Sequence, residues 1–341
     1  MQKKMNKFRS FLANPLAGYI LFAILLVLLQ VLSGMGLVKV QFMRTIGRTI
    51  IYSIITMGFA ILLGYGGLAS LGTAGFIGLG SYITEYMLRQ LHLNYILILV
   101  ICILVAFLIG IIFGFISLRI EGMYLAIVTL SLSAIFVEFF RNIWGPDVVL
   151  INTINLFGLA LTREYMYYFI IVFFVIFAVI TNNIMRSPTG RAMLAMKNSD
   201  SAAQAMGVNV LKYRITAFVI SAIYALFAGA LYLGYFKNTG PDDWNLSLSL
   251  NILAAIVLGG SKSVWGGVLG CFIIFGIDGM ILQQIPFFVE NAGFTYLLNG
   301  ALMIIIVMFY PGGLIRMIND WRGKIKRAIA KRKEGKYAKV K

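Results

Sequence analysis

Three carboxylates lie within or beside long apolar stretches of the chain, where an ionisable side chain is costly and usually serves a function. These residues are Glu85, Glu138 and Asp278. Glu85 precedes Arg89 by four positions and Glu138 precedes Arg141 by three, so each can form an ion pair on a helix surface. Asp278 lies deeper in its apolar stretch. The pattern leaves two interpretations of Asp278 open, an interfacial charge or the coupling site of an ion-driven transporter.

The other residue types that commonly carry chemistry are scarce. His92 is the only histidine, and Cys102 and Cys271 lie in separate apolar stretches without a CxxC spacing. The segment GGSKS at 259–263 resembles a phosphate-binding loop, but it lacks the GxxxxGK[ST] spacing that surrounds phosphate with backbone amides and a lysine. We therefore expect no catalytic residue, no metal ligands and no ATP site in this chain.

The elements that position these residues are expected to cross a membrane. Hydrophobic residues make up 60% of the 341 positions and charged residues only 12%, whereas a soluble domain has roughly 25% charged residues. Most of the apolar stretches are close to 20 residues long, enough to cross the hydrocarbon core as a helix, whereas the one at 246–260 is short. The sequence predicts an all-α polytopic membrane protein of about ten transmembrane helices, over residues 14–36, 45–63, 68–88, 95–117, 122–140, 165–185, 215–236, 246–260, 264–284 and 292–311.

The basic residues predict the orientation. With the N-terminus inside, seven of the 29 Lys and Arg residues lie in outer segments and 22 in inner ones, which fits the positive-inside rule. The N-terminal basic cluster precedes an apolar run without an A-x-A cleavage site, so we expect a retained first span. Eleven Lys or Arg residues in the tail, 316–341, predict a cytoplasmic membrane anchor and argue against nucleic-acid binding. The expected organisation is a transmembrane domain, 1–315, and a basic tail, in a cell-membrane protein with both termini cytoplasmic.

The inner loop, 186–214, reads RSPTGRAMLAMKNSDSAAQAMGVNVLKYR. Ser187 followed by Pro188 predicts an N-cap and the first position of a helix that runs to about Lys197. A second, shorter helix over 201–206 is expected to follow. The loop therefore predicts a bent pair of cytoplasmic helices.

The second helix has recognisable ends and a surface of small residues. Residues 198–200 offer a new N-cap, and Gly207 suits the left-handed C-terminal position. So short a helix is unstable by itself in water, so it must pack against another surface. Its alanines permit close approach, either to the inner helix ends of this protein or to a cytosolic motor subunit.

Here the chain resembles a known family. SAAQAMG at 201–207 resembles the EAA-x3-G loop of ABC importer permeases, although Ser201 replaces the leading acidic residue and the I-x-L-P element is absent. Further blocks are more similar to the LivM-type permeases of branched-chain amino-acid ABC importers. These blocks are GYGGLASLGTAGFIGLGSYI at 64–83, EGMYLAIVTLSLS at 121–133, GRAMLAMKNSDSAAQAMGVNVLKYRITAFVISAIYALFAGALY at 190–232, AIVLGGSKSVWGGVLG at 255–270 and YPGGL at 310–314. Thr73 departs from that family, which usually has histidine there.

The resemblance implies a non-enzymatic permease subunit that moves branched-chain amino acids into the cell by alternating access. It implies two cytosolic ABC ATPases that carry ATP and magnesium, a second, LivH-type permease and an extracytoplasmic substrate-binding protein. The residues implied to couple to an ATPase are Gly190, Arg191, Asp200, Ala202, Ala203 and Gly207.

Two further sets of residues are candidates for function. Glycine combined with serine or threonine permits a broken helix whose backbone lines a cavity. The pathway candidates chosen on this ground are Gly66, Gly67, Ser70 and Thr73, and Thr129 of the fifth predicted span is a lesser candidate. Charges in the outer segments can orient a binding protein, and the candidates are Arg89, Arg163, Lys237, Asp242 and Asp243.

Three alternatives remain at this point. The same kind of importer could carry urea, another amide or an aromatic acid. An ion-coupled secondary transporter would use Asp278 and need no ATPase, so co-purification of an ATPase distinguishes it. A structural anchor or channel would have no substrate-binding partner.

Overall fold

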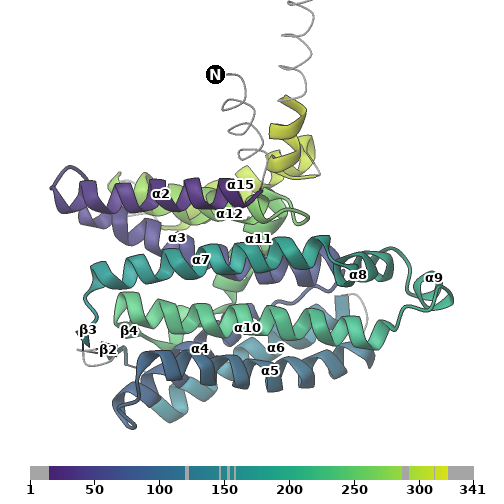
Figure 1. Cartoon of the computed structure of the whole chain (residues 1–341), viewed down its shortest axis with the longest axis horizontal. Helices are drawn as coiled ribbons and strands as arrows, with labels where there is room; N and C mark the ends of the chain where they lie inside the picture. Colours follow the sequence, from purple (N-terminus) through teal and green to yellow (C-terminus); the bar gives the residue numbers. More distant parts are fainter. Residues whose placement is uncertain are drawn as a thin grey trace, which may run out of the picture.

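The computed structural model describes residues 15–119, 123–145, 147–151, 154–156, 159–285, 292–310 and 312–321, and these residues are mostly helical. The long helices lie side by side along the longest axis of the molecule (Figure 1). They are α2 (Pro15–Gly34), α3 (Val40–Phe59), α4 (Thr73–Arg89), α5 (Tyr95–Arg119), α6 (Met123–Trp144), α7 (Arg163–Arg186), α10 (Val210–Phe236) and α15 (Ala292–Phe309). The short helices are α8 (Pro188–Asn198), α9 (Asp200–Ala205), α11 (Leu246–Gly259), α12 (Val264–Cys271) and α13 (Ile277–Met280).

Irregular helical turns interrupt or connect these elements. Two of them are π-helical, η1 (Ala60–Tyr65) and η3 (Phe272–Gly276), and two are 3-10 turns, η2 (Pro241–Trp244) and η4 (Leu282–Gln284). Four two-residue strands form two antiparallel pairs, β1 (Val149–Leu150) with β4 (Asn238–Thr239) and β2 (Asn155–Leu156) with β3 (Leu159–Ala160). The strands lie at the end of the molecule opposite α8 and α9 (Figure 1).

The all-α polytopic fold class is confirmed. Among the described residues, six helices are long and apolar enough to cross a membrane. They span Leu16–Gly34, Val40–Tyr65, Tyr95–Ile116, Tyr124–Trp144, Arg163–Arg186 and Val210–Phe236. Helices also occupy the other four predicted ranges, but α4 has only 17 residues and α11 only 14. The total of about ten membrane crossings therefore stays a prediction.

The centre of the molecule is formed by α3 and α10. In the most apolar 18-residue stretch of each helix, the buried share is 89% for the α3–η1 span, 67% for α10 and only 17% for α2. The apolar surface of α2 is therefore available to lipid. Glycines allow α4 and α10 to pack with their backbones in contact. A Cβ at Gly80 of α4 would lie 2.1 Å from a carbonyl oxygen of α10, and a Cβ at Gly229 of α10 would lie 2.0 Å from a carbonyl oxygen of α4.

Two predicted spans differ from the structure. The span predicted at 68–88 begins only at Thr73, because residues 66–72 leave the helix and Gly67 takes a φ of +71°. The span predicted at 264–284 is divided into α12, η3, α13 and η4. A hydropathy pattern reports how apolar a segment is, but it does not register such breaks.

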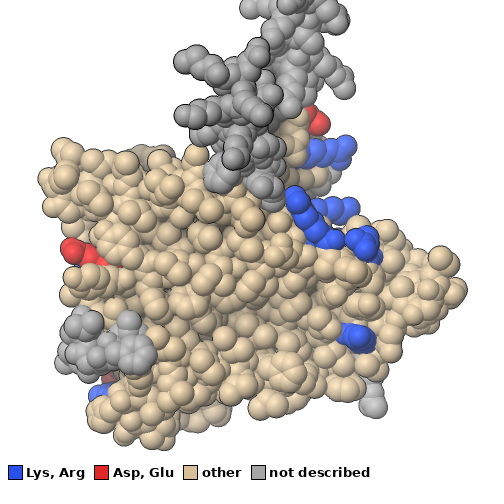
Figure 2. Space-filling model, in the orientation of Figure 1, with Lys and Arg blue, Asp and Glu red and all other residues tan. Residues whose placement is uncertain are grey.

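Charge is distributed unevenly over the surface. Most of the basic side chains visible in Figure 2 gather at the end that carries α8. The N-terminal basic cluster, residues 3–9, and the tail from residue 322 onward lie outside the described residues.

Candidate functional site

Helix α8 is held against the end of α7 by a cap and a glycine. The hydroxyl of Ser187 accepts a hydrogen bond from the Gly190 N–H at 3.3 Å, and Pro188 begins the helix, as predicted. A Cβ at Gly190 would lie 2.5 Å from the carbonyl oxygen of Ile184. Gly190 therefore permits α8 to fold back on α7, and Arg191 beside it is exposed and donates to the carbonyl of Arg186 at 3.2 Å.

Helix α9 is bonded to α10 at its start, and a glycine follows its end. Ser199 caps it by accepting from the Ala202 N–H at 3.3 Å. Asp200 forms an ion pair and hydrogen bond with Arg214 of α10, whose side chain is only 9% exposed. Gly207 takes a φ of +81° after the helix, which confirms the predicted left-handed position.

The two short helices enclose a small apolar cluster of their own. Ala203 is 3% exposed and packs with Met196 and Val210. Ala202 and Ala205 are exposed, and Met206 is 85% exposed. The expected docking face is thus Ala202, Ala205 and Met206, whereas Ala203 stabilises the pair from inside.

Lys197 links α8 to the central helices, a role that sequence analysis missed. Its ammonium donates to the carbonyl oxygens of Leu63 at 3.0 Å and Gly64 at 2.9 Å, at the end of η1. A Cβ at Gly67 would lie 3.0 Å from the Lys197 stem, so the glycine leaves room for it. Partial burial, followed by the nearby charge of Lys262, lowers the pKa of Lys197 from its usual value. Nothing in the loop pattern distinguishes Lys197 from its basic neighbours.

The break between η1 and α4 is stabilised by hydroxyl groups from distant helices. The Leu71 N–H donates to Thr129 Oγ1 of α6 at 2.9 Å, and the Ala74 N–H donates to Ser249 Oγ of α11 at 2.9 Å. A backbone that leaves a helix inside a membrane needs such partners. Ser70 Oγ accepts a longer bond from the Gly72 N–H at 3.4 Å.

The predicted pathway residues therefore belong to one region. Gly66, Gly67 and Ser70 lie in the break, Thr73 begins α4 after it, and Thr129 accepts a hydrogen bond from it. Ser70, Thr73 and Thr129 are each no more than 4% exposed. Their place beside a substrate pathway stays a prediction.

A second polar feature, also missed, runs along α3. Thr45, Thr49, Ser53 and Thr56 are buried on successive turns, and each hydroxyl donates to a carbonyl three or four residues earlier in the same helix. Glycines of α12 to α13 face this hydroxyl stripe, since a Cβ at Gly267 would lie 2.9 Å from Thr56 Oγ1 and one at Gly279 would lie 2.6 Å from Thr45 Oγ1. The spacing of these four residues in the sequence is the signal that could have predicted the stripe.

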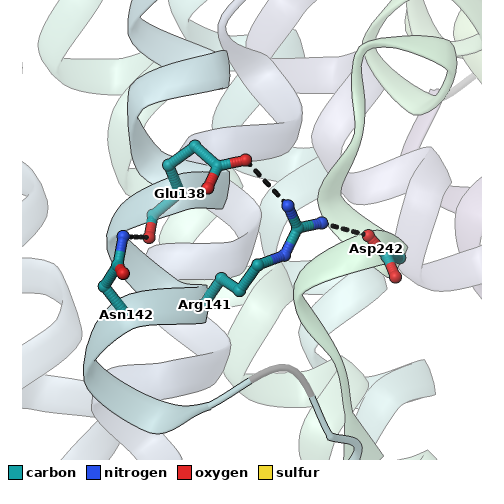
Figure 3. A network of polar contacts seen from close by, with 4 residues as sticks. All are labelled: Glu138, Arg141, Asn142 and Asp242. Carbon is teal, nitrogen blue, oxygen red and sulfur yellow. Dashed lines mark hydrogen bonds and ion pairs between the residues drawn. The ribbon is translucent and has the colours of Figure 1, made fainter.

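Outer ion pairs join helix ends to turns. Arg141 pairs with Glu138 at 2.8 Å, as predicted, and also with Asp242 of η2 at 2.9 Å (Figure 3). Glu85 pairs with Arg89 at 3.5 Å, as predicted, and accepts a hydrogen bond from Trp144 Nε1 at 2.8 Å. These contacts connect α4, α6 and η2 at the end of the molecule opposite α8 and α9.

The predicted docking charges have different surroundings. Arg89 and Asp242 keep 64% and 83% of their side-chain surface exposed although both are paired. Arg163 is half-buried at the start of α7, and Lys237 takes the left-handed position after α10 with a φ of +60°. Asp243 accepts from the Gly240 N–H at 2.9 Å, so it also stabilises η2.

Asp278 is the third of the carboxylates found in apolar stretches of the sequence. Asp278 is half-buried in α13, and the neighbouring Gly279 packs against the outer turns of α3. Within the described ranges, no group of three or more His, Cys, Asp or Glu residues lies together as metal ligands would.

A bundle of helices of membrane-spanning length, with a short helix pair projecting at its basic end, defines the class of protein, a polytopic membrane protein. Residues 41–307 match the family described as the branched-chain amino acid transport system permease component, and the chain belongs to this family.

Individual relatives agree with this assignment. The chain is 28% identical over 312 residues to the high-affinity branched-chain amino acid transport system permease protein LivM of Escherichia coli, covering 83% of this chain and 72% of the relative. It is 26% identical to the probable LivM permease of Methanocaldococcus jannaschii, covering 64% of this chain and 68% of the relative. The L-arabinose ABC transporter permease AraH of Azospirillum brasilense is 29% identical, over 48% of this chain and 49% of the relative. No solved structure matches the chain significantly.

Proposed function

We propose that this chain is the membrane-spanning permease subunit of an ABC importer that moves branched-chain amino acids into the cell. The family and the two LivM relatives support this cargo, because they match most of the chain and are named for branched-chain amino acid transport. The sugar permease matches only about half of it. ATP and magnesium bind to separate ATPase subunits, and this chain performs no catalysis.

The observation that carries the proposal is the anchoring of the α8–α9 pair. Its exposed alanine and methionine face has no packing partner in the described chain, while its other side is fixed to α7, α10 and η1. A motor subunit that binds this face is connected, through the helix pair, to α7, α10 and η1. When two ATPases close on ATP, movement of the pair reaches α10 through Asp200 and Arg214, and reaches η1 through Lys197.

The remaining partners follow from the same arrangement. A second permease, of LivH type, completes the transport pathway beside this chain, and a probable LivH permease of Methanocaldococcus jannaschii is 29% identical over 41% of this chain. A substrate-binding protein delivers cargo at the outer end, where Arg89 and Asp242 are exposed. Both termini lie on the cytoplasmic side with α8 and α9, in accordance with the positive-inside rule.

Affinity purification from native membranes in mild detergent tests the proposal. The tagged chain should bring down an ABC ATPase and a second multi-span permease, identified by mass spectrometry. A cysteine in the Met206→Cys variant should cross-link to the ATPase, whereas one in Leu150→Cys, exposed at the opposite end, should not. Recovery of the chain by itself, in detergent that preserves such complexes, would falsify the importer assignment.

A further inference from the structure

A cavity of about 400 Å³ opens at the outer end of α3. Five lining residues, Val40, Gln41, Arg44, Thr45 and Arg48, come from one face of α3, and Phe236 comes from the end of α10. This volume falls in the range of small-molecule sites, which combine an apolar wall with a few convergent polar groups. None of the charged residues predicted to dock a binding protein lines this cavity.

The charges around this cavity favour an anion. Arg44 and Arg48 are four positions apart, so both guanidinium groups project from the same side of the helix. Arg48 is half-buried, and its Nε is buried with no hydrogen-bond partner in the described chain. A buried donor without an acceptor is destabilising, so the site is more complete with an acceptor bound.

Helix α3 adds to the positive potential. Val40 and Gln41 are its first two residues, and no side chain caps its N-terminus. The positive end of a helix dipole and its free N–H groups favour anionic ligands. A carboxylate matches the planar fork of a guanidinium group better than a spherical ion does.

The surroundings also suit the rest of an amino acid. Phe236 supplies an apolar wall. An amino acid with an apolar side chain carries such an apolar group beside its carboxylate.

The cavity borders the outermost residue of the hydroxyl stripe described above. Thr45 belongs to both, and Thr49, Ser53 and Thr56 follow it inward along α3. Each hydroxyl hydrogen is used within the helix, and the oxygen of Thr56 also accepts a hydrogen bond from the thiol of Cys271 at 3.6 Å. The glycines of α12 to α13 allow their backbone to pack closely against the stripe.

We propose that the cavity at Arg44 and Arg48 binds the carboxylate of an amino acid at the outer entrance of the permease. The proposal rests on the import function given above and adds a specific subsite to it. Arg48 is the main contact, and Arg44 and the first turn of α3 assist it.

The test uses the purified complex of the chain with its partner subunits in phosphatidylcholine nanodiscs, without binding protein. Equilibrium binding of radiolabelled L-leucine is measured for the wild type, Arg44→Gln, Arg48→Gln and Arg48→Lys. Lys39→Gln is the control, because it removes a positive charge at the same helix end without lining the cavity. Isocaproate, which keeps the carboxylate, and isoamylamine, which lacks it, serve as competitors.

We expect leucine affinity to fall roughly tenfold or more in each Arg→Gln variant, less in Arg48→Lys, and not in Lys39→Gln. Isocaproate should compete and isoamylamine should not. Unchanged binding in both Arg→Gln variants, no saturable binding to the wild type, or equal competition by the two analogues would each overturn the cavity assignment. ATP-driven leucine uptake by the same wild-type complex with binding protein is measured separately, and only its absence would also overturn the proposed function.

Discussion

Lys197 connects two parts of the chain that are 133 positions apart, since its ammonium contacts the carbonyl of Gly64. In the proposed importer this contact would transmit movement, because Lys197 lies on a short helix of the proposed docking pair and Gly64 lies at the end of a central helix. A single side chain thus joins the inner loop to the break beside the predicted pathway.

Replacing Lys197 with methionine should impair coupling while leaving assembly intact. The variant keeps the stem that packs on Gly67 but loses two hydrogen bonds, a loss of roughly 1 kcal/mol at this partly exposed site. Leucine uptake per ATP hydrolysed, measured in proteoliposomes, should fall several-fold, and Lys197→Arg should retain more of it. Uptake equal to wild type in Lys197→Met would rule out the link.

Thr129 accepts a hydrogen bond from the N–H of Leu71, which lies 58 positions away in the sequence. Thr129→Val preserves the shape of the side chain but leaves this buried donor unsatisfied, which should destabilise the fold by about 1–3 kcal/mol. Thr129→Ser keeps the oxygen and should cost less. Thermal unfolding of the purified complex compares the two, and equal loss in both variants would assign the effect to packing.

At the scale of elements, the α8–α9 pair owes its structure to two caps, two glycines and a three-residue cluster. The caps and Gly207 were predicted from the sequence and are confirmed, but the orientation of α9 was not. Ala203 was chosen as a docking residue together with Ala202, yet it points inward. Six residues of a helix do not contain enough apolar periodicity to decide which face is buried.

Ala202→Glu and Ala203→Glu should therefore fail in different ways. Glutamate at exposed position 202 should weaken binding of the ATPase by roughly tenfold or more without changing folding. Glutamate at position 203 should disrupt the helix pair itself, because it buries an unpaired charge. Binding of the ATPase and protease sensitivity of the loop distinguish the two, with exposed outer Gln90→Glu as the charge control. Intact ATPase binding in Ala202→Glu would exclude this docking face.

At the scale of the whole molecule, the structure has two functionally different ends. In the proposed orientation, the inner end carries α8, α9, Lys197 and most of the visible basic surface (Figure 2), and the outer end carries the Arg141 network (Figure 3) and the Arg44–Arg48 cavity. The α3–η1 span runs between them, from the cavity to the Lys197 contact. In the proposed mechanism, this one span connects the two ends during alternating access.

The proposed orientation can be measured by labelling whole cells with a membrane-impermeant maleimide. Cys102 and Cys271 are buried, so the native background should be low. Leu150→Cys should react in intact cells and Met206→Cys only after the membrane is permeabilised. The reverse pattern would show that the inner and outer ends have been exchanged.

The sequence by itself determined the features that depend on local interactions. Apolar stretches of membrane length identified the polytopic helical fold, and the basic asymmetry gave its expected orientation. Ser187, Pro188 and Gly207 marked helix ends because caps and left-handed turns involve only a few neighbouring residues. The ion pairs of Glu85 with Arg89 and Glu138 with Arg141 were predictable for the same reason.

Only the tertiary structure decided which distant groups meet. The interruption before α4, the Lys197 contact with η1, the inward orientation of Ala203 and the cavity at Arg44 and Arg48 all depend on how helices pack. Thr129 and Ser249 stabilise one break from positions 58 and 175 residues away from the groups they bond. Such contacts form because a buried polar backbone must find a partner, and the geometry of the bundle determines which side chain supplies it.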